Sequence, residues 1–115
     1  MTLKHFNIEQ DPKMAGLDIK LMVLLDNART MADMPFIITS GKRSIYSNKE
    51  AGGVVDSSHL KGLAADIECN NDHEAFLIKK GAYVAGFRRI GTGKGHIHLD
   101  IDPDKPQDVD FIENH

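Results

Sequence analysis

Hydrophobic side chains recur every three or four residues between Leu17 and Met31, which is the spacing of one face of an amphipathic helix. A second helix is predicted from about Asn71 to Val84, because Asn71 and Asp72 are favourable N-cap residues. The side chains expected along one side of this helix are Ala75, Phe76, Lys79, Ala82 and Tyr83. The chain is therefore predicted to contain two principal helices.

Short apolar or alternating segments outside these helices are typical of strands. Residues 35–39 form a short apolar run, and residues 62–68 alternate between two faces. Two more strands are predicted at residues 88–90 and 96–101, joined by a glycine-rich turn at residues 91–95. Because helices and strands are mixed without regular βαβ alternation, the sequence predicts an α+β domain with a small, mainly antiparallel sheet.

The remaining segments are polar and aperiodic. Residues 1–12 are expected to form an irregular N-terminal arm, and residues 102–115 an acidic, polar C-terminal tail on the surface. Residues 40–58 are rich in Gly, Ser, Asn and Lys and are expected to form a long loop with little regular structure, of the kind that is usually functional or disordered. No repeat or flexible linker divides the chain, so residues 1–115 are predicted to form a single domain.

Composition and charge narrow the classes of partner. The formal net charge is −3, and no cluster of Lys and Arg offers a binding surface for nucleic acid or an anionic membrane. The single cysteine, Cys69, cannot form an internal disulfide. There is no apolar signal-peptide segment and no run of apolar residues long enough to span a bilayer, so neither a signal peptide nor membrane insertion is expected.

One candidate for metal binding is the pair His59 and Asp66, which a glycine-containing turn could bring to one point. Histidine and aspartate are common, and this gap is not a general metal signature. The spacing fits equally well a surface histidine followed by a solvated strand carboxylate.

The second cluster gives a stronger signal. His96, His98 and Asp100 alternate along a predicted strand and therefore share one face, while Ile97 and Leu99 point to the other. Two such histidines can bind a metal together, or one can bind it while the other serves in acid–base chemistry. A less favoured reading is a solvent-facing strand that happens to carry two histidines.

Two histidines and a carboxylate suit a catalytic zinc site, because they leave one coordination position for water and lower the pKa of that water towards about 7. Such a water can attack a carbonyl, provided that a base takes its proton and a cation stabilises the developing oxyanion. Arg43 is a candidate for the cation, although it could also be an ordinary surface arginine. The chain has no G-x-S-x-G or H-E-x-x-H motif, and Cys69 has no histidine at a diagnostic spacing.

Together these residues resemble the M15 zinc peptidases, most of all the short branch found in phages and bacteria. The resemblance extends from about Phe6 to Ile101. It is carried by five motifs in order, namely Ile38-Thr-Ser-Gly-x-Arg43, Gly52-Gly53, Ser57-x-His59-x-x-Gly62-x-Ala64-x-Asp66, Gly86-Phe-x-Arg-Ile-Gly91 and His96-x-His98-x-Asp100. The resemblance implies a fold shared with the hedgehog signalling domain.

The resemblance also implies a set of site residues. His59, Asp66 and His98 would be the ligands of one Zn²⁺ ion, Arg43 would face the substrate carbonyl, and Ser57 would contact the substrate.

The general base is where this chain departs from the family. Many members have Asp or Glu three residues before the last ligand, and here that position is Gly95. His96 is therefore the first candidate for the base. Asp100 is the second, unless it orients a ligand histidine instead.

The family includes D-Ala-D-Ala carboxypeptidases, vancomycin-resistance dipeptidases and phage L-alanyl-D-glutamate endopeptidases. The resemblance thus implies a zinc peptidase that hydrolyses peptidoglycan stem peptides, either as a lysis enzyme that reaches the cell wall through a separately encoded holin or as part of a phage particle. The alternative is a zinc-stabilised binding or structural module without catalysis, which the glycine at position 95 favours. The sequence leaves the oligomeric state open and is compatible with a monomer.

Overall fold

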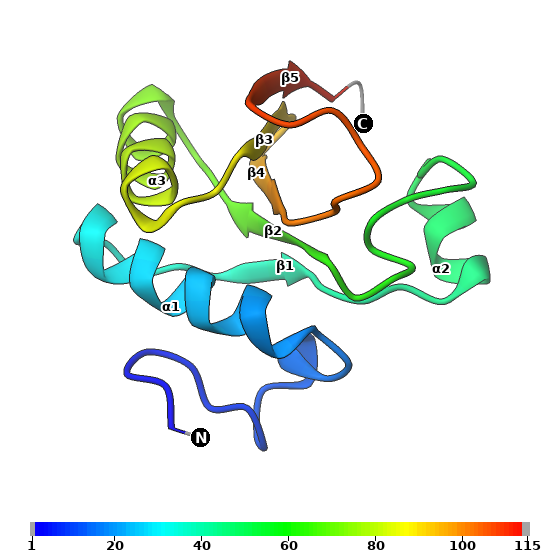
Figure 1. Cartoon of the computed structure of the whole chain (residues 1–115), viewed down its shortest axis with the longest axis horizontal. Coiled ribbons are helices and arrows are strands. Elements are labelled where there is room, and N and C mark those ends of the chain that lie inside the picture. The colour runs from blue at the N-terminus through cyan, green and yellow to red at the C-terminus, as the bar shows by residue number, and fades with distance from the viewer. Residues whose placement is uncertain (1, 114–115) are drawn as a thin grey trace.

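The computed structural model describes residues 2–113 and confirms the α+β architecture (Figure 1). Two long helices, α1 (Ile19–Ala32) and α3 (Asp72–Ala85), pack against each other and cover one face of a five-stranded sheet. The two principal helices predicted from the sequence are both present. Each begins and ends within about two residues of its predicted bounds.

Local capping explains where these helices begin and end. The Asp18 side chain accepts a hydrogen bond from the backbone N–H of Lys20 at the start of α1, and the Asn71 side chain accepts one from Glu74 at the start of α3. Helix α3 ends at Gly86, whose φ of 109° is a left-handed conformation that glycine adopts without strain.

The buried side of α3 is not the one on which Phe76 and Tyr83 lie. Phe76 and Tyr83 are 65% and 56% exposed, while the buried residues of the helix are Ile78, Gly81 and Ala82. A side chain at Gly81 would collide with the backbone of α1 at Ala28. The close approach of the two helices, which the sequence pattern does not reveal, therefore selects the small residues of α3 for the interface.

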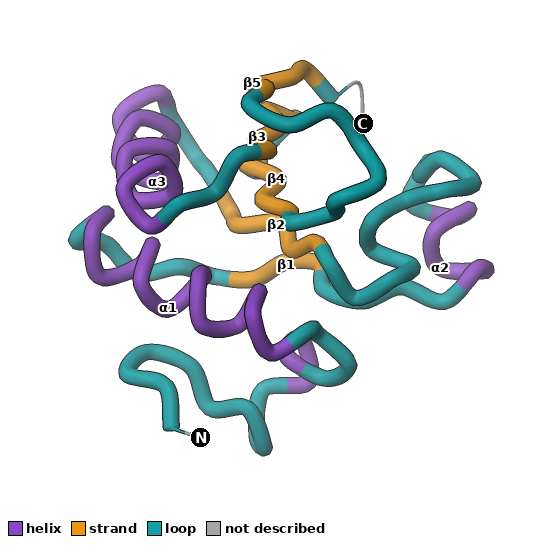
Figure 2. The backbone as a smooth tube through the Cα atoms, in the orientation of Figure 1, coloured by secondary structure: helices purple, strands orange, loops and turns teal. Residues whose placement is uncertain are grey.

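The sheet is mainly antiparallel, as predicted, with strand order β1-β2-β4-β3-β5 (Figure 2). The first three strands in this order pair antiparallel, and β4 also pairs antiparallel with β3. The edge strand β5 runs parallel to β3. The strand bounds are β1 Ile38–Ser40, β2 Ala64–Glu68, β3 Arg89–Gly93, β4 His96–Asp100 and β5 Val109–Ile112.

Four segments are more regular than the sequence predicted. The long loop at residues 40–58 contains a short helix, α2 (Ile45–Glu50), and a 3₁₀ turn (Pro12–Met14) follows the N-terminal arm. The predicted turn at residues 91–95 shortens to a two-residue connection, since β3 continues to Gly93. The polar tail contains β5, a strand that the charged residues around it conceal in the sequence.

Side chains of the central strands alternate between the two faces of the sheet, with apolar residues on one face and candidate site residues on the other. Apolar residues of the central strands join the hydrophobic core beneath α1 and α3, and these are Ala65, Ile67, Ile90, Ile97 and Leu99. The residues between them, including Asp66, His98 and Asp100, point to the opposite face. The candidate site therefore lies on the side of the sheet away from the two long helices.

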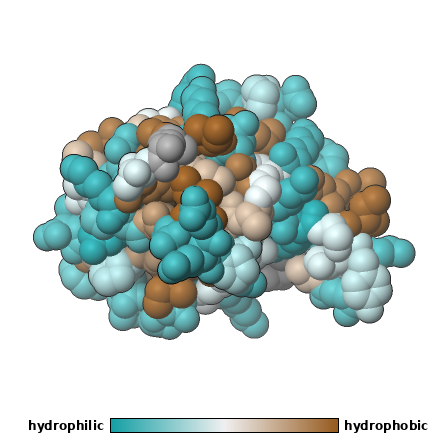
Figure 3. All heavy atoms as spheres, turned by 90° about the horizontal axis from the view of Figure 1, so that it is seen from below, coloured by the Kyte–Doolittle hydropathy of each residue, from teal (hydrophilic) through white to brown (hydrophobic). Residues whose placement is uncertain are grey.

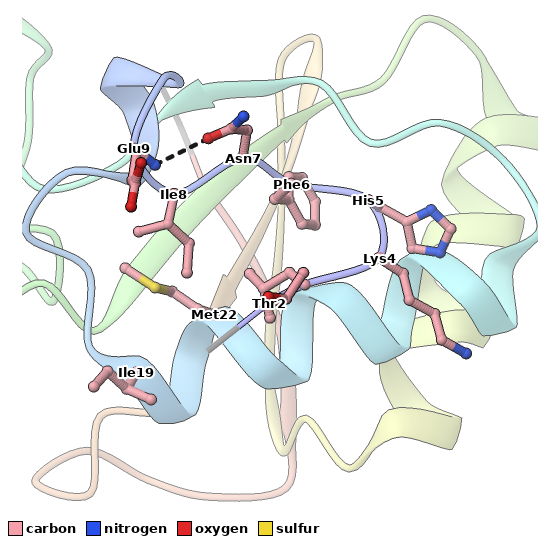
Figure 4. A pocket seen from close by; sticks show the side chains of 10 residues that line it. Thr2, Lys4, His5, Phe6, Asn7, Ile8, Glu9, Ile19 and Met22 are labelled. Atoms are coloured by element: carbon pink, nitrogen blue, oxygen red, sulfur yellow. Dashed lines mark hydrogen bonds between the residues drawn. The ribbon is translucent and has the colours of Figure 1, made fainter.

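The N-terminal arm runs back along α1 and is fastened to it by the buried carboxylate of Asp26. This carboxylate accepts hydrogen bonds from the backbone N–H groups of Lys4 (3.0 Å) and His5 (2.8 Å). Between the arm and the helix lies an open hollow of about 710 Å³, lined by Phe6, Ile8 and Met22 among others (Figure 4). The hollow shares no lining residue with the cleft described below.

The surface seen in Figure 3 is largely hydrophilic, with hydrophobic side chains in separate patches. Among residues 2–113, no helix has both the length and the apolar character that crossing a membrane requires.

A buried carboxylate fastens the segment after β4 to the turn before β2. Asp102 is fully buried and accepts hydrogen bonds from Ser58 Oγ (2.8 Å) and Lys61 Nζ (3.0 Å). Burial raises the pKa of the Asp102 carboxyl, but the hydrogen bonds from Lys61 and Ser58 outweigh burial and lower it. The carboxylate form is thus favoured in the folded protein.

Replacing Asp102 with Asn should lower the free energy of unfolding at pH 7 by about 2 kcal/mol, because charge-assisted hydrogen bonds at a buried site are lost. The folded-state pKa lies below the unfolded value of about 3.9, so this stabilisation is complete above about pH 5 and shrinks as the pH falls past about 4. Urea unfolding of metal-free protein at pH 7 and at about pH 3.5 measures both effects. Asp104→Asn is the matched control, since Asp104 also contacts Lys61 (3.5 Å) but is 80% exposed and should matter by less than about 0.5 kcal/mol. Equal losses from the two variants at pH 7 would contradict this account.

Candidate metal centre

His59, Asp66 and His98 converge on one point of the sheet. Their ligand atoms lie within 4.8 Å of one another, and all three residues are buried. Asp66 Oδ1 is 3.2 Å from His59 Nε2 and 3.2 Å from His98 Nδ1. A surface histidine beside a solvated carboxylate, the alternative that the spacing left open, does not describe this arrangement.

The fold fixes each of these side chains from a different element. Asp66 on β2 lies directly opposite His98 on β4 in the antiparallel register. His59 reaches the same point from a tight turn that ends at Gly62, whose φ is +73°. A side chain at Gly62 would collide with the backbone carbonyl of Gly16, so this turn depends on glycine.

The outer nitrogen of each histidine is held by an acceptor. His59 Nδ1 donates to the backbone carbonyl of Gly41 (2.8 Å), and His98 Nε2 donates to Asp100 Oδ2 (2.6 Å). The opposite nitrogens, Nε2 of His59 and Nδ1 of His98, therefore face Asp66. Contacts of this type fix the ring orientation and tautomer of metal-binding histidines.

Asp100 is itself enclosed. Its Oδ1 accepts hydrogen bonds from Arg89 Nε (2.7 Å) and from the backbone N–H of Asp102 (3.0 Å), and the side chain is fully buried. Arg89 also lies over the ring of Phe111, 5.0 Å from the centroid. Of the two roles considered for Asp100, this geometry favours the one in which it orients His98.

The electrostatics of the three residues suit a bound cation. Burial raises the pKa of the Asp66 carboxyl, but hydrogen bonds from His59 and His98 outweigh it and hold the pKa below the usual range. Burial lowers the pKa of His98, whereas its bonds to Asp100 and Asp66 raise the pKa to about 9. A divalent cation held between these side chains would balance the charge of the buried Asp66 carboxylate. Two nitrogens and one carboxylate oxygen are a donor set that Zn²⁺ uses in catalytic sites.

Arg43 is part of the same constellation and is not an ordinary surface arginine. Its side chain is only 9% exposed, and Nη2 lies 3.2 Å from Asp66 Oδ2. Ser40 Oγ (3.0 Å from Nε) and Asn48 Oδ1 (3.4 Å from Nη1) hold the guanidinium in place. Arg43 thus lies beside the three candidate ligands.

A cleft of about 290 Å³ opens over these residues. Ser57 lies in its wall, where Ser57 Oγ accepts a hydrogen bond from the backbone N–H of His59 (3.2 Å). The charged side chains of the lining are Arg43, Arg89, Lys105, Asp100 and Glu113, and apolar groups such as Val54 and Phe111 lie among them. The cleft therefore offers charges of both signs beside the histidines.

His96 has a partner that sequence reasoning missed. Its Nε2 lies 2.7 Å from Glu113 Oε1, and Glu113 Oε2 is 3.6 Å from His98 Nδ1. Glu113 follows β5, and its backbone N–H donates to the carbonyl of Thr92 (2.8 Å). The alternation of Val109, Phe111 and Glu113 is the signal that could have placed this carboxylate on the site face.

The comparison with known families agrees with this geometry. The sequence profile described as peptidase M15 matches residues 1–100, which include every predicted ligand and His96, Arg43 and Asp100. Glu113 lies beyond the matched segment. No curated protein is similar enough in sequence for a closer comparison. With the match covering most of its length, the chain belongs to the M15 family of peptidases.

Proposed function

We propose that the protein is a zinc-dependent peptidase that hydrolyses peptide bonds in peptidoglycan stem peptides. The observation that carries this proposal is the buried cluster of His59, Asp66 and His98, whose two histidines line a cleft together with Arg43. Families of this kind use a metal to activate water and polarise a carbonyl. The family and the donor set therefore point to the same chemistry.

In the proposed mechanism, His59, Asp66 and His98 would hold one zinc ion. That ion would supply polarisation of the scissile carbonyl and a lower pKa for the attacking water. Arg43, which Ser40 and Asn48 hold in place, stabilises the negative charge that develops on the carbonyl oxygen. The water oxygen bonds to the carbonyl carbon, the C–N bond breaks, and the proton released by the water passes to the leaving amine.

The proton needs an intermediate acceptor beside the ligands. The sequence nominates His96 and Asp100 for this step. Asp100 is occupied by Arg89 and His98, so we assign it to orienting the His98 ring. His96 remains beside the site, and its part in the reaction depends on Glu113, as argued below.

A cation in the cleft favours a substrate with a free carboxylate. Arg43, Arg89 and Lys105 line the cleft together with the carboxylates of Asp100 and Glu113, and Arg43 and Arg89 are paired with Asp66 and Asp100. Stem peptides of the bacterial wall carry free carboxylates, which Lys105 could bind. Ser57 lines the same cleft and would contact such a chain. We propose on this basis that the protein acts on the cell wall, as a phage or bacterial lysis or remodelling enzyme.

Digestion of purified peptidoglycan, followed by mass spectrometry of the released muropeptides, is expected to show cleavage within or at the end of the stem peptide. The cleavage should disappear with a chelator and return when Zn²⁺ is added back, since the proposed chemistry depends on the metal. The masses of the products identify the bond and separate carboxypeptidase from endopeptidase action. Unchanged muropeptides in the presence of Zn²⁺ would contradict the proposal.

The second candidate function is a zinc-stabilised module without catalysis. Gly95, at the position where many relatives place an acidic residue, is the observation that favours it. This alternative expects stoichiometric zinc and a large loss of thermal stability on chelation, but no product in the digestion experiment.

A further inference from the structure

The pair formed by His96 and Glu113 joins the last residues of the described chain to the centre of the site. The two side chains are 14% and 12% exposed, and their closest atoms are 2.7 Å apart. An imidazole N–H donates to a carboxylate oxygen, so Glu113 is the acceptor of this bond.

Both nitrogens of His96 face groups that accept hydrogen bonds. Nε2 faces Glu113 Oε1, and Nδ1 lies 3.2 Å from the backbone carbonyl of Lys94, which cannot donate. Each nitrogen of the ring thus has an acceptor as its neighbour. In this geometry, neither nitrogen of His96 is directed to take a proton from water above the metal ligands.

Glu113, in contrast, reaches the position where a metal would be held. Its Oε2 is 3.6 Å from His98 Nδ1, the nitrogen that faces Asp66. A ligand atom of Glu113 also lies within 4.8 Å of those of Asp66 and His96. The Glu113 carboxylate is therefore next to the cluster of His59, Asp66 and His98, on the side that His96 covers.

The backbone fixes this placement. The bond from Glu113 N–H to the carbonyl of Thr92 continues the pairing of β5 with β3, and Gly93 lies directly opposite His96 across β3 and β4. A side chain at Gly93 would collide with the imidazole of His96. The absence of a side chain there leaves room for the ring that holds Glu113.

We propose that Glu113 is the carboxylate that accepts the proton of the attacking water, and that His96 holds and orients it. The proposal rests on the proposed peptidase function. A proton moves from water to Glu113 Oε2 as the water oxygen bonds to the carbonyl carbon, and the same proton then passes to the leaving nitrogen as the C–N bond breaks. A carboxylate from the end of β5 thus serves at a site where Gly95 offers none.

Glu113→Gln, which keeps the shape of the side chain but cannot take the proton, is expected to lower kcat on the muropeptide substrate by about a hundredfold or more. KM and the zinc content should stay within about threefold of the wild type, because Glu113 is not one of the proposed ligands. Glu113→Ala should recover part of its activity when formate is added, since formate can replace the missing carboxylate. Glu50→Gln on the exposed end of α2 is the matched control and should leave kcat unchanged.

A second readout does not depend on turnover. In zinc-free protein, the NMR signal of His96 Nε2 is expected to show the hydrogen bond to Glu113, and Glu113→Gln should change this signal. In His96→Gln, kcat should fall by less than in Glu113→Gln, because the base itself remains.

Three results would overturn the proposal. The first is a Glu113→Gln enzyme with kcat within threefold of the wild type. The second is a loss of zinc from this variant, which would make Glu113 a ligand. The third is rescue of His96→Gly by imidazole with no rescue of Glu113→Ala by formate. A wild-type protein that cleaves no stem peptide would instead overturn the proposed function, and the NMR experiment would still test the pairing of His96 with Glu113.

Discussion

Replacing His59 with Ala is expected to remove stoichiometric zinc binding and to lower kcat/KM on stem peptides by at least about a thousandfold. A loss of that size corresponds to about 4 kcal/mol of transition-state stabilisation, which is within what a catalytic metal supplies. His59 contributes one of only two nitrogens in the cluster, and Gly41 holds the ring in the orientation that presents Nε2. The bound zinc measured by elemental analysis and the rate on muropeptides check the two parts of the prediction.

Thermal unfolding separates the metal from the fold. Zinc should stabilise the wild type by about 4 kcal/mol at a free concentration a thousand times its Kd, and His59→Ala should lose this response. His73→Ala is the matched control, because His73 is an exposed histidine at the start of α3. An His59→Ala protein that keeps both zinc and activity would show that the cluster is not the catalytic centre.

Periodicity was enough to predict the elements that bury one continuous face. The three- and four-residue spacing in α1 and the strict alternation of β4 follow directly from burial against the core, and both predictions are confirmed. The same alternation predicts that His96, His98 and Asp100 share one face of their strand. Helix spacing and strand alternation depend only on local backbone geometry, so they can be recognised in the sequence.

Convergence of the two clusters depends on strand order, which no local pattern contains. Asp66 meets His98 only because β2 and β4 are neighbours that pair in this register, and the spacing of His59 and Asp66 alone left that meeting undecided. The motifs of the peptidase family supplied this information indirectly. Neither the periodicity nor the family motifs predicted Glu113, since it follows a short strand within a polar tail and lies outside the matched residues.

Asp100 is the residue for which sequence left two roles open, and substitution should separate them. Asp100→Asn keeps the shape of the side chain but removes the charge that balances Arg89, whose guanidinium is 9% exposed. Breaking a buried pair from one side typically costs about 3–5 kcal/mol. Arg89 retains its bond to the carbonyl of Pro106 (2.6 Å), so we expect a loss of about 3 kcal/mol, or a fall in Tm of about 12 °C.

The same substitution should weaken zinc binding by about ten- to a hundredfold, because His98 Nε2 loses the carboxylate that orients it. When zinc is supplied in excess, an orienting role leaves kcat within about tenfold of the wild type. A general base at Asp100 would instead lower kcat by about a hundredfold or more even in the zinc-loaded enzyme.

Asp108→Asn is the control for the stability change. Asp108 also pairs with an arginine, at 2.7 Å from Arg88 Nε, but both side chains are exposed. Asp108 has a φ of 60°, a conformation that asparagine tolerates as well as aspartate does, so the backbone contributes no difference. Its substitution should change the free energy of unfolding by less than about 0.5 kcal/mol. The opposing outcome is that Asp100→Asn changes the free energy of unfolding by as little as Asp108→Asn and leaves zinc affinity unchanged. That result would show that the contacts from Arg89 through Asp100 to His98 do not hold the His98 ring in place.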